Sequence, residues 1–266
     1  MKKKLKNKLN QEDNMRRIRS NIPYFLLVLF AAFCIFVTGT DSGRAVAAAV
    51  TKRDLPIYCV QKDEKVLSIS FDAAWGNEDT QQLIEIMDEY GIKATFFVVG
   101  DWARKYPESV KALHDAGHEI MSHSDKHKHM TKLSVDEIKA DVTACGEAIE
   151  SVTSVTPTLF RPPYGEYDNK VVGTLRDLGY YTIQWDVDSL DWKETGVQDV
   201  IDRVLGKVQP GSIVLFHNAA KYTPEALPTI VETLLDEGYS FVPISQLIYK
   251  DNYKIDHTGK QIPISK

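Results

Sequence analysis

Five short stretches of the sequence carry side chains that could do acid–base or metal-assisted chemistry. Each holds a carboxylate, an imidazole or a guanidinium at or just after an apolar run. A carboxylate or imidazole can serve as general base or general acid, and an imidazole is also a good ligand for Zn²⁺ and related ions. The five stretches read FDAAW at 71–75, HSDKH at 123–127, RPPYG at 161–165, DVDSLDW at 186–192 and LFH at 215–217.

The two histidines of the second stretch are spaced as a metal-binding pair. His123 and His127 are four residues apart, which brings two rings to one ion if the turn after the strand is helix-like. The chain has seven histidines, so a chance pattern is a real alternative. Their neighbours His118 and His129 could be a hydrogen-bonded core residue and an exposed loop residue. The spacing alone leaves both interpretations open.

The elements that must position these residues alternate between strand and helix. Runs rich in Val, Ile, Phe and Tyr are typical of parallel strands buried on both faces, and amphipathic patterns that often end at a glycine predict helices between them. Such alternation indicates a parallel sheet, and periodicity allows either an incomplete barrel or a doubly wound open sheet. Strands are expected over 65–72, 93–100, 118–123, 157–161, 181–187, 211–217 and 239–244, and helices over 79–90, 107–116, 134–151, 168–178, 197–208 and 224–237.

The polar residues of the five stretches fall where expected strands end. Asp72, His123, Arg161 and His217 are all placed in this way. The carboxyl ends of the strands of a parallel barrel share one rim, where residues far apart in sequence converge. The placement therefore predicts a single site.

Taken in order, the five stretches resemble the motifs of polysaccharide deacetylases of the NodB-homology family (carbohydrate esterase family 4). The resemblance covers about residues 63–250. It implies an α/β fold, a distorted (β/α) barrel of about seven parallel strands. It also implies an N-deacetylase acting on linear amides, the N-acetyl groups of amino sugars in a glycan. Cell-wall peptidoglycan is the expected substrate, with chitooligosaccharide as the other candidate.

The resemblance also assigns catalytic roles. Asp72 matches the general base that takes a proton from the attacking water, and Arg161 matches the arginine that pairs with it. His217 matches the general acid that protonates the leaving amine. Asp191 matches the carboxylate that hydrogen-bonds this histidine. Two other aspartates of the same stretch compete for this last role: Asp186 and Asp188.

Substrate-binding roles follow from the same resemblance. Tyr164 carries the backbone N–H that would bind the developing oxyanion, and Trp192 would form a wall of the sugar groove. Leu215, together with Ile213, would line the pocket for the acetyl methyl group. Trp75 is a further candidate for stacking on a sugar ring, with a buried structural role as the alternative.

Ala73 is the departure from the family pattern, because the family usually has a metal-binding aspartate there. The family implies a divalent metal, Zn²⁺ or else Co²⁺ or Mn²⁺, on His123 and His127. Four accounts are open. The two histidines and waters suffice, Asp72 becomes a ligand, a nearby residue substitutes, or no metal binds. The candidates for the substitute ligand are Asn77 and Asp79. The Ala-Ala-Trp sequence resembles a clostridial and sporulation-type subgroup of deacetylases.

The amino-terminal region predicts a membrane topology signal. Residues 1–20 hold eight Lys or Arg and two Asp or Glu, whereas the whole chain has a formal charge of −5. The following apolar stretch, of about 18–20 residues, is long enough to span a bilayer, and its basic flank predicts a body outside the cytoplasm. This charge distribution does not indicate nucleic-acid binding.

We therefore expect a single-pass protein of the bacterial cell membrane, with secretion as the alternative if a signal peptidase cuts near residues 45–47. The expected parts are a basic cytoplasmic tail (1–21), a transmembrane anchor or signal segment (22–40), a linker (41–62), the catalytic domain (63–250) and a C-terminal tail (251–266).

Two alternatives to the deacetylase hypothesis remain from the sequence. Loss of the metal ligand at position 73 would suit a carbohydrate-binding protein without turnover. An O-acetyl esterase or a metal-free hydrolase of small amides would suit the same fold, since fold alone does not fix the substrate. In an exported body, Cys59 and Cys145 could form a disulfide, or they could be free buried thiols.

Overall fold

The computed structural model describes residues 53–264 and, before them, Phe30 alone. Residues 54–266 form one compact unit. The predicted cytoplasmic tail and, apart from Phe30, the predicted membrane segment at 22–40 lie outside the described residues. Within the described part of the chain, no helix has the length and apolar character needed to cross a membrane.

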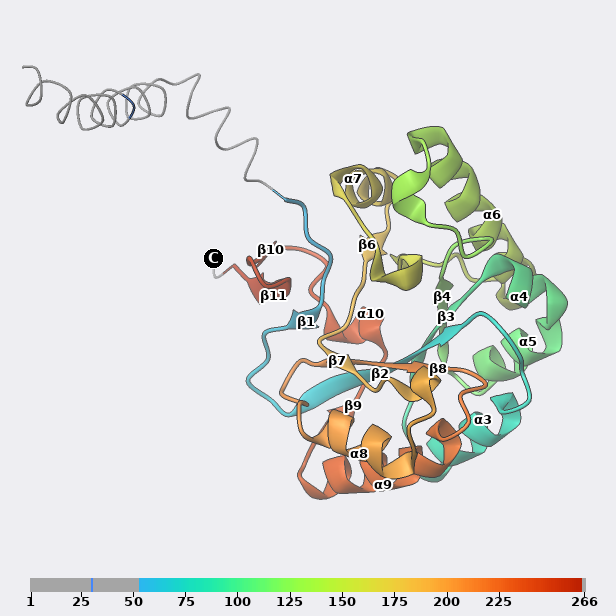
Figure 1. The fold of residues 1–266 in the computed structure, drawn as a ribbon, viewed down its shortest axis with the longest axis vertical. Helices are drawn as coiled ribbons and strands as arrows, with labels where there is room; N and C mark the ends of the chain where they lie inside the picture. Colours follow the sequence, from blue (N-terminus) through green and yellow to red (C-terminus); the bar gives the residue numbers. More distant parts are fainter. Residues whose placement is uncertain (1–29, 31–52, 265–266) are drawn as a thin grey trace, which may run out of the picture. The chain divides into compact units, whose positions relative to one another are not determined.

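A curled parallel sheet forms the centre of this unit (Figure 1). Its strands lie in the order β6-β5-β4-β3-β2-β8-β7, and β9 pairs with the start of β2; every pairing is parallel. The predicted distorted (β/α) barrel is confirmed. The strands are β2 (Val66–Ala73), β3 (Thr95–Val98), β4 (Glu119–Ser122), β5 (Leu159–Phe160), β6 (Tyr181–Thr182), β7 (Val187–Asp188), β8 (Ile213–His217) and β9 (Ser240–Phe241).

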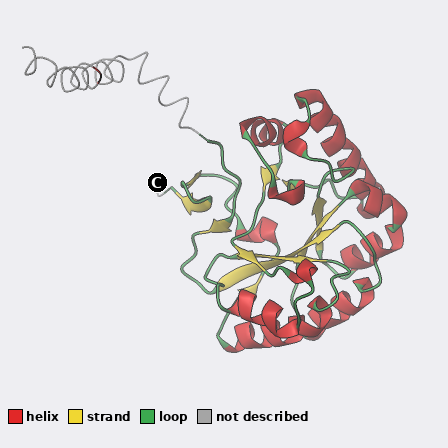
Figure 2. Cartoon of the chain, viewed as in Figure 1, coloured by secondary structure: helices red, strands yellow, loops and turns green. Residues whose placement is uncertain are grey.

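The longer helices lie around the outside of the curled sheet (Figure 2). All six predicted helices are present, with ends within three residues of those expected. The sequence missed α4, which has only six residues, and α10, which has four. The helices are α3 (Thr80–Glu89), α4 (Gly100–Lys105), α5 (Pro107–Asp115), α6 (Val135–Thr153), α7 (Asn169–Asp177), α8 (Val197–Leu205), α9 (Thr223–Asp236) and α10 (Ile244–Leu247).

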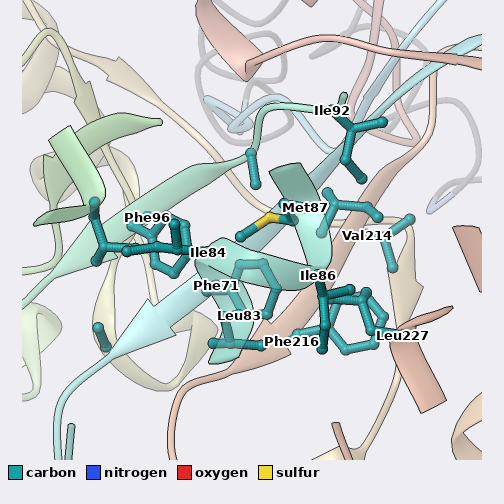
Figure 3. Close-up of a cluster of buried hydrophobic side chains, with 14 of the residues drawn as sticks. Phe71, Leu83, Ile84, Ile86, Met87, Ile92, Phe96, Val214, Phe216 and Leu227 are labelled. Atoms are coloured by element: carbon teal, nitrogen blue, oxygen red, sulfur yellow. The ribbon is translucent and has the colours of Figure 1, made fainter. Parts of the chain in front are cut away.

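The pleat of β2 separates the apolar core from the site. Alternate residues of a strand point to opposite faces, and Phe71 packs on the helix side, stacked on Phe96 and Phe216 at centroid distances of 4.7 and 5.6 Å (Figure 3). Ala73 belongs to the same buried cluster. Asp72 lies between them in sequence and so faces the interior of the barrel, as the next section describes.

Segments expected to be linker and tail take part in a second sheet. Strand β1 (Cys59–Val60) pairs in parallel with β11 (Lys260–Pro263), which pairs antiparallel with β10 (Tyr253–Ile255). The folded unit therefore extends beyond both ends of the predicted catalytic domain. The expected strand over 181–187 is also interrupted, because Gln184 donates its backbone N–H to Ile57 O at 2.7 Å instead of continuing the ladder.

The two cysteines of the described region are free thiols. Cys59 and Cys145 are both buried and are not joined to each other. Burial raises the pKa of Cys59 to about 11 and that of Cys145 to about 12. A thiol with such a raised pKa is a poor nucleophile, so both cysteines are structural.

Candidate active site

A pocket of about 570 Å³ opens where β2, β4 and β8 end. Eight of the ten residues predicted for the site line it, and the other two, Arg161 and Asp191, are fully buried and bonded to lining residues. The predicted residues that line the pocket are Asp72, Trp75, His123, His127, Tyr164, Trp192, Leu215 and His217.

Asp72 and Arg161 form a buried ion pair at the bottom of the site. Arg161 donates from Nη1 to Asp72 Oδ1 at 2.8 Å and from Nη2 to Ser70 Oγ at 2.9 Å. Burial alone would raise the pKa of the Asp72 carboxyl, but the adjacent His123, Arg161 and His217 hold that pKa below its usual range. The guanidinium is the permanent positive charge of this group, so Asp72 is an ionised, oriented carboxylate at neutral pH.

His123 and His127 face each other with ring centroids 5.0 Å apart. His123 Nδ1 lies 2.7 Å from the carbonyl oxygen of Arg161. A carbonyl only accepts, so Nδ1 carries the proton and Nε2 keeps its lone pair. Burial lowers the pKa of His123, and it lowers the pKa of His127 to about 4. Both imidazoles are therefore neutral, and a backbone carbonyl orients the first, as is usual for metal ligands.

The donor set fits a divalent ion only in part. Among the described residues, no three His, Cys, Asp or Glu side chains lie close enough to hold one ion together. Ala73 has no donor and is buried on the helix side of the sheet. Two imidazoles could hold an ion if water or substrate completed its coordination, whereas catalytic zinc usually has three protein ligands.

Neither of the two substitute ligands considered from the sequence lines the pocket. Asn77 donates from Nδ2 to Ser109 Oγ at 3.0 Å, and Asp79 accepts at Oδ2 from the backbone N–H of Ala219 at 2.8 Å. The structure therefore does not support either residue as a substitute ligand. Asp72 is held by Arg161 through Oδ1, while its Oδ2 lies 3.5 Å from His123 Nε2.

His217 and Asp191 form the second polar pair of the site. Asp191 Oδ1 lies 2.7 Å from His217 Nδ1, and Oδ2 accepts from the His217 backbone N–H at 2.8 Å and from Thr223 Oγ1 at 2.6 Å. Burial alone would lower the pKa of His217, but its hydrogen bond to Asp191 and the charges of Asp191, Asp72 and Asp188 raise it above the usual value. The imidazolium form is thereby stabilised close to neutral pH.

The other two aspartates considered for this pairing have different partners. Asp186 accepts from Ser212 Oγ and from the backbone N–H of Ile213, both at 2.8 Å. Asp188 lines the pocket but accepts from the backbone N–H of Leu190 at 2.9 Å and from the Trp185 indole at 3.2 Å. The choice of Asp191 among the three aspartates therefore agrees with the geometry.

Three exposed aromatic side chains surround the pocket: Trp75, Tyr164 and Trp192. Tyr164 has a left-handed backbone (φ 61°), and its ring stacks on His129 at a centroid distance of 4.3 Å. A positive φ in a bulky residue is uncommon and indicates a constrained turn, here the one that follows Arg161-Pro162-Pro163. Trp75 stacks on His217, with centroids 5.9 Å apart and planes 18° from parallel.

Four lining residues were given no role from the sequence: Ala74, Gly165, Trp185 and Leu190. Trp185 lies just before β7, in the break between two short strands. The sequence predicted one continuous strand there, so it gave no indication that Trp185 faces the pocket. Leu190 lines the pocket and has a left-handed backbone (φ 52°), a conformation for which an apolar residue gives no sequence signal.

A barrel with a candidate base, Asp72, and a candidate acid, His217, in one pocket is the arrangement of a hydrolase. Comparison with known proteins gives its family. The family model for polysaccharide deacetylases matches residues 60–183. A peptidoglycan-N-acetylglucosamine deacetylase of Bacillus cereus is 32% identical over 194 residues, which are 71% of this chain and 91% of the relative. The chain belongs to the polysaccharide deacetylase family.

Two further relatives differ in length or in activity. The Bacillus subtilis protein YlxY is 31% identical over 73% of this chain, which spans only 60% of that relative. The solved structure of a Bacillus anthracis protein described as a pseudoenzyme of carbohydrate esterase family 4 is 35% identical, with a TM-score of 0.70 over 72% of this chain and 68% of that one. A mutant of that pseudoenzyme is described as having restored enzymatic activity.

Proposed function

We propose that this protein removes N-acetyl groups from the amino sugars of cell-wall peptidoglycan. The observation that carries the proposal is the pair of buried dyads, Asp72–Arg161 and Asp191–His217, whose Asp72 and His217 both line one pocket. They supply, in the same pocket, an ionised carboxylate and an imidazole whose pKa is raised. The Bacillus cereus relative is named for the same reaction on peptidoglycan N-acetylglucosamine.

In this mechanism Asp72 takes the proton of the water that attacks the acetamide carbonyl. Arg161 keeps the carboxylate ionised and oriented. The backbone N–H of Tyr164 binds the developing oxyanion, which stabilises the tetrahedral state. His217, protonated because of Asp191, gives its proton to the leaving amine. Leu215 lines the part of the pocket that takes the acetyl methyl group.

The same proposal includes a divalent cation, with Zn²⁺ first and Co²⁺ or Mn²⁺ as alternatives. His123 and His127 would hold it. When bound, such an ion lowers the pKa of water and polarises a carbonyl. Because position 73 supplies no ligand, we expect weaker binding than in relatives with three protein ligands. Isothermal titration of the metal-stripped chain with Zn²⁺, repeated on His127→Ala, measures this without any turnover.

We further propose that the protein is anchored in the bacterial cell membrane with its catalytic domain outside the cytoplasm. The support is the sequence: a basic segment followed by an uncharged apolar stretch over residues 22–37. An alkaline carbonate wash of bacterial membranes tests the anchor. An anchored chain stays in the pellet, whereas release into the supernatant or the medium contradicts the anchor and supports a cleaved signal.

The test of the function is acetate release by the purified full chain from peptidoglycan and from chitooligosaccharide. The chain is metal-stripped and then supplied with Zn²⁺, Co²⁺ or Mn²⁺. Release that depends on metal and is lost in His123→Ala and His217→Ala supports the deacetylase. Faster release from an acetylated xylan ester than from either amide would instead support an O-acetyl esterase.

A glycan-binding protein without turnover is the second candidate. Ala73 and the 35% identity to a solved pseudoenzyme favour it. Binding of chitooligosaccharide by a folded chain that releases no acetate from chitooligosaccharide or from peptidoglycan, with any of the three metals, would establish this candidate and overturn the first.

A further inference from the structure

The side chain of Asn218 fastens the loop after β2 to the end of β8. Its Oδ1 accepts from the backbone N–H of Ala74 at 3.2 Å, and its Nδ2 donates to the carbonyl oxygens of Trp75 at 2.6 Å and Gly76 at 2.8 Å. A carboxamide has two N–H donors, and both are used here on consecutive residues. With only 2% of its surface exposed, Asn218 is a buried clamp on three residues of one loop.

This clamp is itself rigidly held. Asn218 follows His217 directly, and its backbone N–H donates to the carbonyl oxygen of Asp72 at 3.2 Å. The next residue, Ala219, has a left-handed backbone (φ 52°) and donates its N–H to Asp79 Oδ2 at 2.8 Å. The loop is thus fixed to β8 at both of its ends.

The backbone at residue 76 and the backbone at residue 219 approach so closely that position 76 must be glycine. A Cβ on Gly76 would lie 2.7 Å from the Cβ of Ala219, and the φ of Gly76 is +55°. Both facts exclude a side chain there at this separation. The indole of Trp102 also donates to the Gly76 carbonyl. The backbone of residues 74–76 therefore has little freedom, and the Asn218 side chain makes three of the hydrogen bonds that hold it.

Trp75 is the residue that this clamp holds in place. Trp75 is 47% exposed and lines the pocket, and its ring lies nearly parallel to the His217 ring. With the backbone fixed on either side, only the two side-chain torsions of Trp75 remain free. An exposed indole would otherwise sample several rotamers, at a cost in entropy when a ligand orders it.

We propose that Asn218 is a positioning residue for glycan binding: through the backbone of residues 74–76 it holds the Trp75 ring over His217 as a preformed wall for a pyranose ring. The nature of the ligand, an oligosaccharide of N-acetylated amino sugars, rests on the proposed function. The placement of Trp75 by Asn218 rests only on the hydrogen bonds and the ring geometry described above.

A double-mutant cycle on the full chain tests the coupling of the two residues. Affinity for chitotetraose is measured by isothermal titration for the wild type, Asn218→Ala, Trp75→Ala and the double variant. We expect each single variant to bind about tenfold more weakly, the scale of one aromatic contact. The double variant should bind no more weakly than Trp75→Ala, because Asn218 acts through Trp75.

The matched control is Asn77→Ala, which removes one hydrogen bond from the same loop, to Ser109, without touching residues 74–76. Its affinity should equal that of the wild type. If Asn218→Ala does not fold, Asn218→Asp replaces it, since this variant keeps the acceptor for Ala74 and loses both donors. It should weaken binding in the same way.

Tryptophan emission gives a readout that needs no ligand. The emission of Trp75 is the difference between each protein and its Trp75→Ala counterpart, and it should shift to the red in Asn218→Ala as the indole leaves His217. Unchanged Trp75 emission and unchanged affinity in a folded Asn218 variant, or additive losses in the double variant, would overturn the proposal. A wild type that binds chitotetraose but releases no acetate from chitotetraose or from peptidoglycan, with any of the three metals, would refute the deacetylase and leave the positioning role intact.

Discussion

Asp191 determines the protonation state of His217. Replacing it by Asn removes the largest of the charges that raise the pKa of His217, so we expect the pKa to fall. The acid then loses its proton at a lower pH, and the alkaline limb of the kcat–pH profile moves to lower pH. We expect kcat at neutral pH to fall by about 100-fold, the lower end for general acid catalysis.

The matched control for this change is Asp186→Asn, in the same sequence stretch but bonded to Ser212 and Ile213. It should leave the alkaline limb in place, and a limb that stays in place in Asp191→Asn would contradict the assignment. The raised pKa also has a stability consequence. The pair stabilises the fold fully below the usual pKa of histidine, and this stabilisation is lost as the pH rises through the folded pKa.

Arg161 compensates the buried charge of Asp72. Arg161→Met leaves that carboxylate buried without its partner, and breaking a buried pair in this way costs about 3–5 kcal/mol of the free energy of unfolding. Urea denaturation at pH 7 measures the loss. The lowered pKa of Asp72 means that the pair stabilises the native protein above the usual carboxyl pKa, and that this stabilisation disappears as the pH falls through the folded pKa.

The difference between Arg161→Met and the wild type should therefore shrink toward acid pH, because the unpaired Asp72 protonates more readily. A difference that is the same at pH 7 and pH 4 would mean that the guanidinium acts through packing on Phe97, whose ring centroid lies 4.2 Å away, rather than through charge.

At the scale of elements, α6 gives the clearest local test. It begins with a capping box of Ser134 and Glu137 and ends at Ser154, which has a left-handed backbone (φ 57°). Glycine adopts this conformation without the strain of a side chain. Ser154→Gly should raise the free energy of unfolding by roughly 0.5–1 kcal/mol, measured by urea denaturation.

Ser151→Gly is the control, three residues earlier inside the same helix. It should destabilise the protein by a similar amount, since glycine is unfavourable in a helix interior. If both substitutions destabilise, the end of α6 is not limited by the backbone of Ser154.

The arrangement of strands and loops explains which site residues could be predicted from the sequence and which could not. Asp72, His123 and His217 were placed correctly because parallel strands bring their carboxyl ends to one rim, a rule of topology rather than of contacts. Leu190 could not be found, since its place in the pocket depends on one left-handed backbone angle. The role of Asn218 could not be predicted either, because it depends on distances between two loops that are over 140 residues apart in sequence.

At the scale of the whole molecule, the two ends of the folded unit hold each other. Backbone N–H groups of Tyr58 and Gln61 donate to Gly259 and Gln261. The carboxamide of Gln261, fully buried, bonds the backbone N–H and carbonyl of Tyr249 at 2.8 and 2.7 Å. The C-terminal strands therefore form part of the folded unit, in the second sheet with β1, rather than a loose tail.

A chain that stops after Lys250 lacks β10 and β11 and should be less stable by roughly 3–5 kcal/mol, since at least four hydrogen bonds of about 1 kcal/mol each are lost together with the cover over Cys59. Gln261→Ala, which removes only the two side-chain bonds, should show about half of this loss. The segment before β2 also pairs with the chain ahead of Trp185, where Ile57 bonds Thr182 and Gln184. Release of that segment should therefore weaken chitotetraose binding as well as lower the melting temperature.

A truncated chain with the melting temperature of the full chain would show instead that the barrel does not depend on the second sheet for its stability.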